Sequence, residues 1–115
     1  MIAMKVLITG GAGFIGSHLA AALLDGRAEV RILDNLRGGN RCGLKGLNLD
    51  MIEASVLDTD ALRAAVSGVD VVYHLAAMIS AKESMENPRE CVEINTLGTL
   101  NVLRAAADAG VRKLV

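Results

Sequence analysis

Short apolar runs alternate with segments of helical periodicity along the chain. Residues 5–9 form a β-branched and aliphatic run that ends in a glycine cluster, which predicts a buried strand leading into a tight turn. Apolar positions in residues 14–24 recur at helical spacing, and an Asp-Gly pair marks the end of that helix. Residues 29–33 alternate apolar and charged side chains, which predicts a second strand that reaches Asp34.

The rest of the chain continues this alternation. In order, the pattern predicts a mobile loop over residues 36–46, a third strand over 47–54, a helix over 59–66, a fourth strand over 69–75, a loop over 78–88, a long helix over 90–109 and the beginning of a fifth strand over 112–115. The element order is therefore β-α-β-β-α-β-α-β. Because alternating strands and helices build a parallel sheet with right-handed crossovers, we expect an α/β fold.

Composition narrows the classes of function. The 115 residues are 52 % hydrophobic and only 2 % aromatic, so the chain can form one domain with an aliphatic core but lacks platforms for stacking bases. Lys and Arg number 12 against 13 for Asp and Glu, so no basic stripe favours a nucleic acid or an anionic membrane as partner.

Cysteine usage and the N-terminal sequence bear on the compartment. Cys42 and Cys91 are the only cysteines and stand in unlike contexts, which fits a reducing cytoplasm better than a disulfide framework. The first residues lack the charged head and long apolar run of a signal peptide, and charged or turn residues interrupt every apolar run before it reaches membrane-spanning length. We therefore expect a cytoplasmic protein.

A glycine-rich turn joins the first strand to the first helix. Gly10-x-x-Gly13-x-x-Gly16 overlaps Gly11-x-Gly13-x-x-Gly16 at that point. Glycines there permit the sharp turn, the approach of a pyrophosphate to the backbone and the packing of the helix on the strand, while N–H groups at the helix start bind the anion. With the element order, this predicts a dinucleotide site on a Rossmann-like, doubly wound parallel sheet of about five strands. The alternative is a purely structural turn; a mononucleotide P-loop is excluded, because no Gly-Lys-Ser/Thr follows.

Asp34 stands at the end of the second predicted strand, where a carboxylate accepts hydrogen bonds from the adenosine ribose hydroxyls and repels a 2′-phosphate. This favours NAD over NADP as the cofactor. Arg37 and Arg41 follow closely and could weaken that preference. The alternative interpretation of Asp34 is that it caps a turn.

Several stretches together resemble one family. The sequence resembles the extended short-chain dehydrogenase/reductases, the NAD-dependent epimerases/dehydratases, and its pattern is most similar to UDP-glucose 4-epimerases and related nucleotide-sugar enzymes. The stretches that carry the resemblance are Thr9-Gly-Gly-Ala-Gly-Phe-Ile-Gly-Ser-His-Leu19, Asp34-Asn35-Leu36, residues 69–77, Asn87-Pro88 and residues 95–103. The match covers nearly the whole chain.

The resemblance implies cofactor contacts at the positions that match the family's motifs. These are Gly10, Gly13, Phe14, Ile15 and Gly16 at the diphosphate, Asp34 and Asn35 at the adenosine ribose, Ser55 and Val56 at the end of the third strand near the adenine, Leu75, Ala76 and Ala77 beside the cofactor, and Asn95 in support of the active-site region. Asn95 could instead be a polar residue satisfied inside a helix interface.

The chain departs from the family in two places. Ser55 stands where the family usually has an Asp that contacts the adenine amino group, so Asp58 is better interpreted as a helix cap. Lys82 does not fall at the spacing of the lysine that contacts the cofactor in some epimerases. His18 and His74 lack partners at metal-ligand spacing, so we expect core or surface histidines and no metal site.

The family's chemistry uses a Tyr-x-x-x-Lys pair with a nearby Ser or Thr, in which the tyrosine moves the substrate proton. Tyr73 is the only tyrosine and has no lysine four residues later, so no catalytic residue is assigned. We therefore expect residues 1–115 to be the N-terminal part of an NAD(P)-binding Rossmann domain, without catalytic and substrate regions and inactive alone. The parent enzyme would transfer a hydride transiently between a nucleotide sugar and NAD. The alternative is a non-catalytic dinucleotide-binding mini-domain that acts as a sensor or subunit.

The long helix over 90–109 is apolar on more than one side, which predicts burial on several sides and an exposed flank in a chain of this length. In the family, this helix contributes to a dimeric bundle, so the resemblance implies a homodimer. Ordinary packing against the sheet is the alternative.

Overall fold

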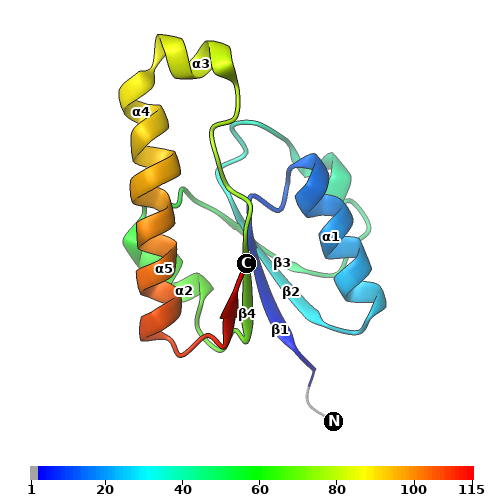
Figure 1. Ribbon diagram of the computed structural model, residues 1–115. Coiled ribbons are helices and arrows are strands. Elements are labelled where there is room, and N and C mark those ends of the chain that lie inside the picture. Colours follow the sequence, from blue (N-terminus) through cyan, green and yellow to red (C-terminus); the bar gives the residue numbers. More distant parts are fainter. Residues whose placement is uncertain (1–2) are drawn as a thin grey trace.

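A parallel sheet forms the centre of the computed structural model, which describes residues 3–115 (Figure 1). The strands are β1 (Lys5–Thr9), β2 (Glu29–Asp34), β3 (Asp50–Glu53), β4 (Val71–His74) and β5 (Lys113–Leu114). They lie in the order β3-β2-β1-β4-β5, and every neighbouring pair is parallel. Strands β2 and β3 thus lie on one side of β1, and β4 and β5 lie on the other. This order confirms the predicted doubly wound Rossmann-like fold.

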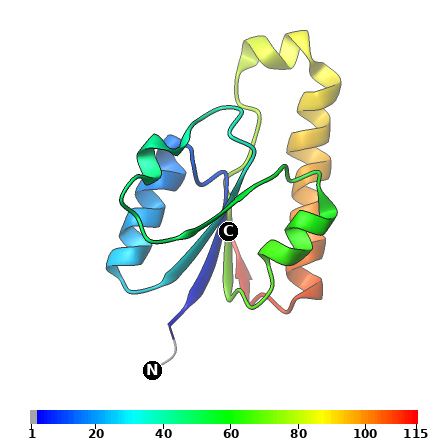
Figure 2. The ribbon, with the colours of Figure 1, turned by 180° about the vertical axis from the view of Figure 1, so that it is seen from behind.

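Helices cover both faces of this sheet. They are α1 (Phe14–Asp25), the 3₁₀-helix η1 (Arg41–Leu44), α2 (Thr59–Ala65), α3 (Ala81–Glu86), α4 (Pro88–Val92), the π-helix η2 (Glu93–Leu97) and α5 (Gly98–Asp108). The view from behind shows η1 beside α1 on one face, and α2 beside α5 on the other (Figure 2). The helix α3 projects beyond the sheet at the top of the view in Figure 1.

Strand β1 owes its central place to side chains that are apolar on both faces. Val6 and Ile8 pack in the core on the α1 side, whereas Leu7 packs in the core on the side of α2 and α5. All three are at most 1 % exposed. A continuous apolar run is what a strand covered on both faces requires, because successive side chains point to opposite faces.

The structure shortens or subdivides several predicted elements. The third strand begins at Asp50 rather than at residue 47, because Leu47 and Leu49 precede the strand and pack against the α1-side core. The loop expected over 78–88 contains α3, whose first turn is capped by Ser80: its hydroxyl accepts a hydrogen bond from the Glu83 N–H over 3.3 Å. The glycine-rich loop over 36–46 contains η1.

The predicted long helix is continuous from α4 through η2 to α5, and only one of its sides is buried in this chain. Val102 and Ala106 face the core, with 0 % and 4 % of their surfaces exposed. Leu100 and Leu103, in contrast, are exposed. The expected burial on several sides is therefore absent among residues 3–115, and an apolar flank remains. No helix in this range is long and apolar enough to cross a membrane.

A close approach fixes α5 against the segment that follows β3. Gly98 lies so near Val56 that a Cβ at position 98 would stand 2.5 Å from the Val56 Cγ2 atom. The Asn101 side-chain amide also donates a hydrogen bond to the Val56 carbonyl over 3.1 Å. The absence of a side chain at Gly98 thus determines how closely the long helix packs.

We predict that Gly98→Ala lowers the free energy of unfolding when residue 56 is valine and raises it when residue 56 is alanine. In the wild-type background the collision should destabilise the fold by about 1–3 kcal/mol, as overpacking does. With Val56→Ala the collision is gone, and the better helix propensity of alanine should stabilise the fold by up to about 1 kcal/mol. Urea unfolding of the two single variants and the double variant measures both effects; a Gly98→Ala variant as stable as wild type would contradict the packing described.

Candidate functional site

A cleft of about 340 Å³ lies at the carboxyl ends of β1, β2 and β4. This is the place where successive connections leave a doubly wound sheet in opposite directions, and ligands of such sheets bind there. The predicted site residues that line the cleft are Gly10, Gly13, Asp34, Asn35, Ser55, Val56, Leu75, Ala76 and Ala77. Four other predicted site residues, Phe14, Ile15, Gly16 and Asn95, lie outside its lining.

Two of the glycines are required by packing within the turn. Gly10 has a φ of +72°, which side chains disfavour, and a Cβ there would stand 2.7 Å from the Ala76 nitrogen. A Cβ at Gly16 would stand 2.6 Å from the Gly10 carbonyl oxygen. These two glycines therefore allow β1, the start of α1 and the segment after β4 to come together.

Gly13 is different, because the protein itself leaves room beside it. Its φ is −76°, and the only neighbour of a Cβ at that position is the Gly10 carbonyl oxygen, at 3.4 Å. Gly13 also lines the cleft. A side chain here would fit the fold but would take up space where a ligand meets the backbone.

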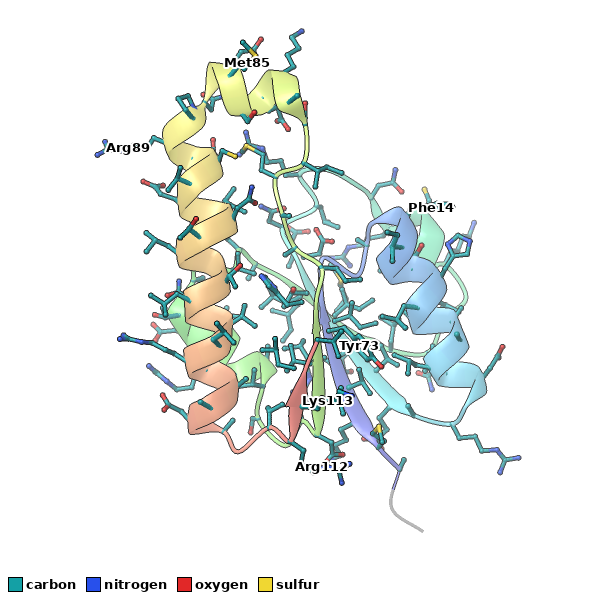
Figure 3. The ribbon with its side chains drawn as sticks, viewed as in Figure 1. Phe14, Tyr73, Met85, Arg89, Arg112 and Lys113 are labelled. Carbon is teal, nitrogen blue, oxygen red and sulfur yellow. The ribbon has the colours of Figure 1, made fainter. Side chains whose placement is uncertain are left out.

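The N-terminus of α1 offers its N–H groups to an anion. Gly13 is the N-cap residue and provides no side-chain cap, and the first turn contains no acidic residue. The side chains of Phe14 and Ile15 are 81 % and 71 % exposed, and Figure 3 shows Phe14 at the start of α1. An uncapped helix N-terminus whose first turn contains no carboxylate favours binding of a phosphate or diphosphate.

Asp34 connects the end of β2 to the glycine-rich turn. Its Oδ2 accepts a hydrogen bond from the Ala12 N–H over 3.0 Å, and its Oδ1 accepts one from the Leu36 N–H over 2.7 Å. The second bond supports Leu36 at a φ of +61°. Asp34 therefore stabilises a turn, as the alternative interpretation held, and also lines the cleft, where its carboxylate retains acceptor capacity.

Ser55 and Asp58, in the segment between β3 and α2, each accept a hydrogen bond from a nearby backbone N–H. The Ser55 hydroxyl oxygen accepts a hydrogen bond from the Leu57 N–H over 3.1 Å, which leaves its O–H free to donate toward the cleft. Asp58 Oδ1 accepts from the Ala61 N–H over 3.0 Å, so Asp58 is the cap of α2, as the sequence indicated. Val56 is 3 % exposed and lies in the core on the α2 side as well as in the cleft wall.

The buried hydroxyl of Thr9 organises the segment that leaves β4. It accepts hydrogen bonds from the N–H groups of Leu75 and Ala76, over 3.1 and 3.2 Å. Since both lone pairs are then used, the hydroxyl proton is donated to Nδ1 of His74, 2.6 Å away. Sequence analysis did not single out Thr9, because a threonine at the end of a strand carries no sign of such a role.

His74 connects Thr9 to the long helix by hydrogen bonds. With Nδ1 as acceptor, the neutral ring carries its proton on Nε2 and donates it to the Thr99 hydroxyl over 2.9 Å. Thr99 in turn donates to the Asn95 carbonyl oxygen over 2.7 Å. Burial lowers the pKa of His74, in agreement with a neutral ring. The half-buried His74 thus joins β1, β4 and α5 through its two ring nitrogens.

Asn95 acts on the cleft through Met78. Its Oδ1 accepts a hydrogen bond from the Met78 N–H over 2.7 Å, and its Nδ2 donates to the Met78 carbonyl oxygen over 3.0 Å. Met78 lines the cleft, whereas Asn95 does not. Asn95 therefore fixes the path of the chain after β4, which agrees with the interpretation of a polar residue satisfied at a helix interface.

Charged side chains bridge the rim of the cleft. Arg37, in the loop after β2, forms a hydrogen-bonded ion pair with Glu90 of α4 and a second ion pair, over 3.4 Å, with Glu83 of α3. The hydrogen bond with Glu90 is the main reason that the pKa of Arg37 is raised. Arg41 pairs elsewhere, with Glu53 of β3 over 3.4 Å.

Comparison with known proteins agrees with this geometry. The model of the NAD dependent epimerase/dehydratase family matches residues 6–115. The chain is 42 % identical to a UDP-N-acetyl-alpha-D-glucosaminuronate decarboxylase of Bacillus cytotoxicus and 39 % identical to a putative UDP-glucose 4-epimerase of Methanocaldococcus jannaschii. These alignments cover 96 % of this chain in both cases, but 35 % and 36 % of the relatives.

Solved structures share the fold. The UDP-glucose 4-epimerase of Thermus thermophilus, solved in complex with NAD, superposes with a TM-score of 0.87 at 40 % identity. The superposition covers 96 % of this chain and 36 % of that one. The chain therefore spans about a third of the length of the proteins that it matches.

We predict that His74 makes stability fall in mild acid. Because its pKa is lowered in the fold, the unfolded chain binds a proton that the folded chain does not, and the free energy of unfolding decreases as pH falls below about 6.5. Urea unfolding between about pH 7 and pH 5.5 should show this slope in wild type and a smaller one in His74→Asn. The control His18→Asn leaves the bonds among Thr9, His74 and Thr99 intact and should keep the contribution of His74; equal slopes in wild type and His74→Asn would contradict the prediction.

Proposed function

The chain belongs to the NAD-dependent epimerase/dehydratase family, and we propose from this that its cleft binds NAD as the cofactor-binding part of a nucleotide-sugar epimerase or dehydratase. The observation that carries the proposal is the open space beside Gly13 at the uncapped start of α1. A diphosphate needs both features: a backbone that it can approach closely and N–H groups directed at its oxygens.

The residues around the cleft fit the remaining parts of the cofactor. Gly10, Gly13, Phe14 and Ile15 would hold the diphosphate, with Gly16 keeping the turn closed. Asp34 and Asn35 would hold the adenosine ribose, and Ser55 with Val56 would lie at the adenine. Leu75, Ala76 and Ala77 form the part of the wall that follows β4, where small side chains suit a cofactor that crosses the strand ends.

NAD is favoured over NADP by charge. Asp34 lines the cleft at the end of β2, where its carboxylate would repel a 2′-phosphate. The two arginines that could offset this effect, Arg37 and Arg41, are both paired with glutamates. The local charge therefore suits two ribose hydroxyls better than a phosphate.

This chain would bind and orient the cofactor rather than complete a reaction. When bound, the nicotinamide ring supplies a hydride acceptor and donor. Tyr73, the single tyrosine, packs against the α1-side core and is followed four residues later by Ala77, not by a lysine. We propose that the substrate proton is moved by residues outside these 115, and that the substrate is a nucleotide sugar, as the names of the relatives indicate.

We predict that the chain binds NAD in isothermal titration calorimetry and that Gly13→Ala weakens this binding by at least about tenfold. The φ of Gly13 suits alanine, so the variant should unfold at the same urea concentration as wild type. Gly26→Ala is the matched control: it makes the same change at the opposite end of α1, at a φ of −78°, and should leave binding unchanged.

Two results would contradict the proposed site. One is a wild-type chain that shows no binding of NAD or NADP. The other is a Gly13→Ala variant that binds NAD as wild type does, which would place the ligand away from the turn.

The exposed apolar flank of the long helix supports a second proposal, that the chain self-associates into a homodimer through residues 90–109. Val92, Leu100 and Leu103 are 60 %, 44 % and 47 % exposed along this flank. Burial of such side chains against a second copy would be favourable.

We predict a dimer in sedimentation equilibrium and a shift toward monomer in the Leu100→Ser/Leu103→Ser variant, because exposed leucines can be replaced without opening a cavity in the core. A wild-type chain that remains monomeric at high concentration would contradict the homodimer.

A further inference from the structure

Arg37 occupies a position from which it could reach a 2′-phosphate. It lies three residues after Asp34, and the two side chains line the same cleft. Its backbone is held in place, since the Arg37 N–H donates to Asn35 Oδ1 over 3.0 Å. An arginine near the acidic residue at the end of β2 is the general device by which this type of fold accommodates NADP. The sequence around Arg37 thus contains a possible NADP determinant beside an NAD determinant.

The Arg37 guanidinium, however, already forms ion pairs with two carboxylates. Nη1 bonds to Glu90 Oε1 and Nη2 lies 3.4 Å from Glu83 Oε1, so separate nitrogens serve the two acids. Two negative charges outnumber one positive charge at this place, and the field that they produce opposes another anion. A 2′-phosphate would have to displace both carboxylates before it could bind the guanidinium.

The two glutamates are remote in sequence from Asp34 and Arg37. Glu83 belongs to α3 and Glu90 to α4, whereas Arg37 follows β2. Arg89 of α4 is directed differently: it pairs with Glu93 over 3.9 Å, and Figure 3 shows Arg89 pointing away from the cleft. Only Glu83 and Glu90, among the residues that the structure describes, pair with Arg37.

We propose that Glu83 and Glu90 are specificity-determining residues that keep the chain selective for NAD by occupying Arg37. This inference rests on the proposed function and adds to it. In wild type, Arg37 neutralises carboxylates; without them, the same guanidinium becomes available to a phosphate on the ribose. The selectivity of the site would thus depend on the helices α3 and α4 as well as on the loop after β2.

The test compares the ratio of the dissociation constants for NADP and NAD, measured by calorimetry, in wild type and in Glu83→Gln/Glu90→Gln. We expect this ratio to fall by about tenfold in the double variant, because two exposed ion pairs of ordinary strength are removed. Adding Arg37→Gln to the double variant should restore the wild-type ratio. Arg37→Gln alone should not strengthen NADP binding, since the arginine is already occupied in wild type and its loss leaves two carboxylates unneutralised.

A matched control separates the proposal from a general effect of charge. Glu86→Gln/Glu93→Gln changes the net charge of the same helical segment by the same amount without touching Arg37, and should leave the ratio unchanged. A similar fall of the ratio in this control, or no fall in Glu83→Gln/Glu90→Gln, would overturn the inference while NAD binding by wild type left the proposed function intact. If wild type binds neither dinucleotide, the proposed function itself is wrong and the inference falls with it. NAD binding by each variant also reports that it is folded.

Discussion

The site depends on the contact between two turns, one after β1 and the other after β4. Gly10 lies against the backbone of Ala76, and the buried Thr9 hydroxyl accepts hydrogen bonds from the N–H groups of both Leu75 and Ala76. The Leu75 N–H also donates to the Thr9 carbonyl oxygen over 3.0 Å, so several bonds to Thr9 hold the segment after β4 on its path across the strand ends. The two turns form one wall of the cleft, and the segments after β2 and β3 line the rest.

A chain of hydrogen bonds between polar side chains connects this contact to the long helix. Thr9 donates to His74, His74 donates to Thr99, and Thr99 donates to the carbonyl of Asn95 in the π-helical segment. The Asn95 side chain then returns to Met78 in the cleft wall. Asn95 lies in the π-helical turn and Thr99 in the turn that follows, and π-helical turns are frequent at functional sites. The helix thus supports the site without forming its surface.

On the side of the cleft formed by the segment after β2, charged side chains take the place of neutral hydrogen-bonding groups. Asp34 uses two lone pairs to hold the glycine-rich turn and Leu36, and its remaining capacity faces the cleft. Arg37 connects the loop after β2 to α3 and α4 through its ion pairs. Such exposed pairs contribute little to stability, since water screens them, so their effect is better sought in which ligand charge the site tolerates.

The sequence by itself determined the order of the elements, the parallel sheet, the glycine-rich turn and the carboxylate at the end of β2, because periodicity and local turn chemistry specify these features within a few residues. It also identified Asp58 as a helix cap, which depends on the next three residues alone. Only the tertiary structure decided which glycine is required by packing and which leaves space for a ligand, since Gly10 and Gly13 differ in their distance to Ala76, far along the chain. The same holds for Thr9 and His74, for Asn95 and Met78, and for Arg37 with Glu83 and Glu90. Each interaction joins residues at least 17 positions apart in the sequence, and no local pattern records which side chains the fold brings together.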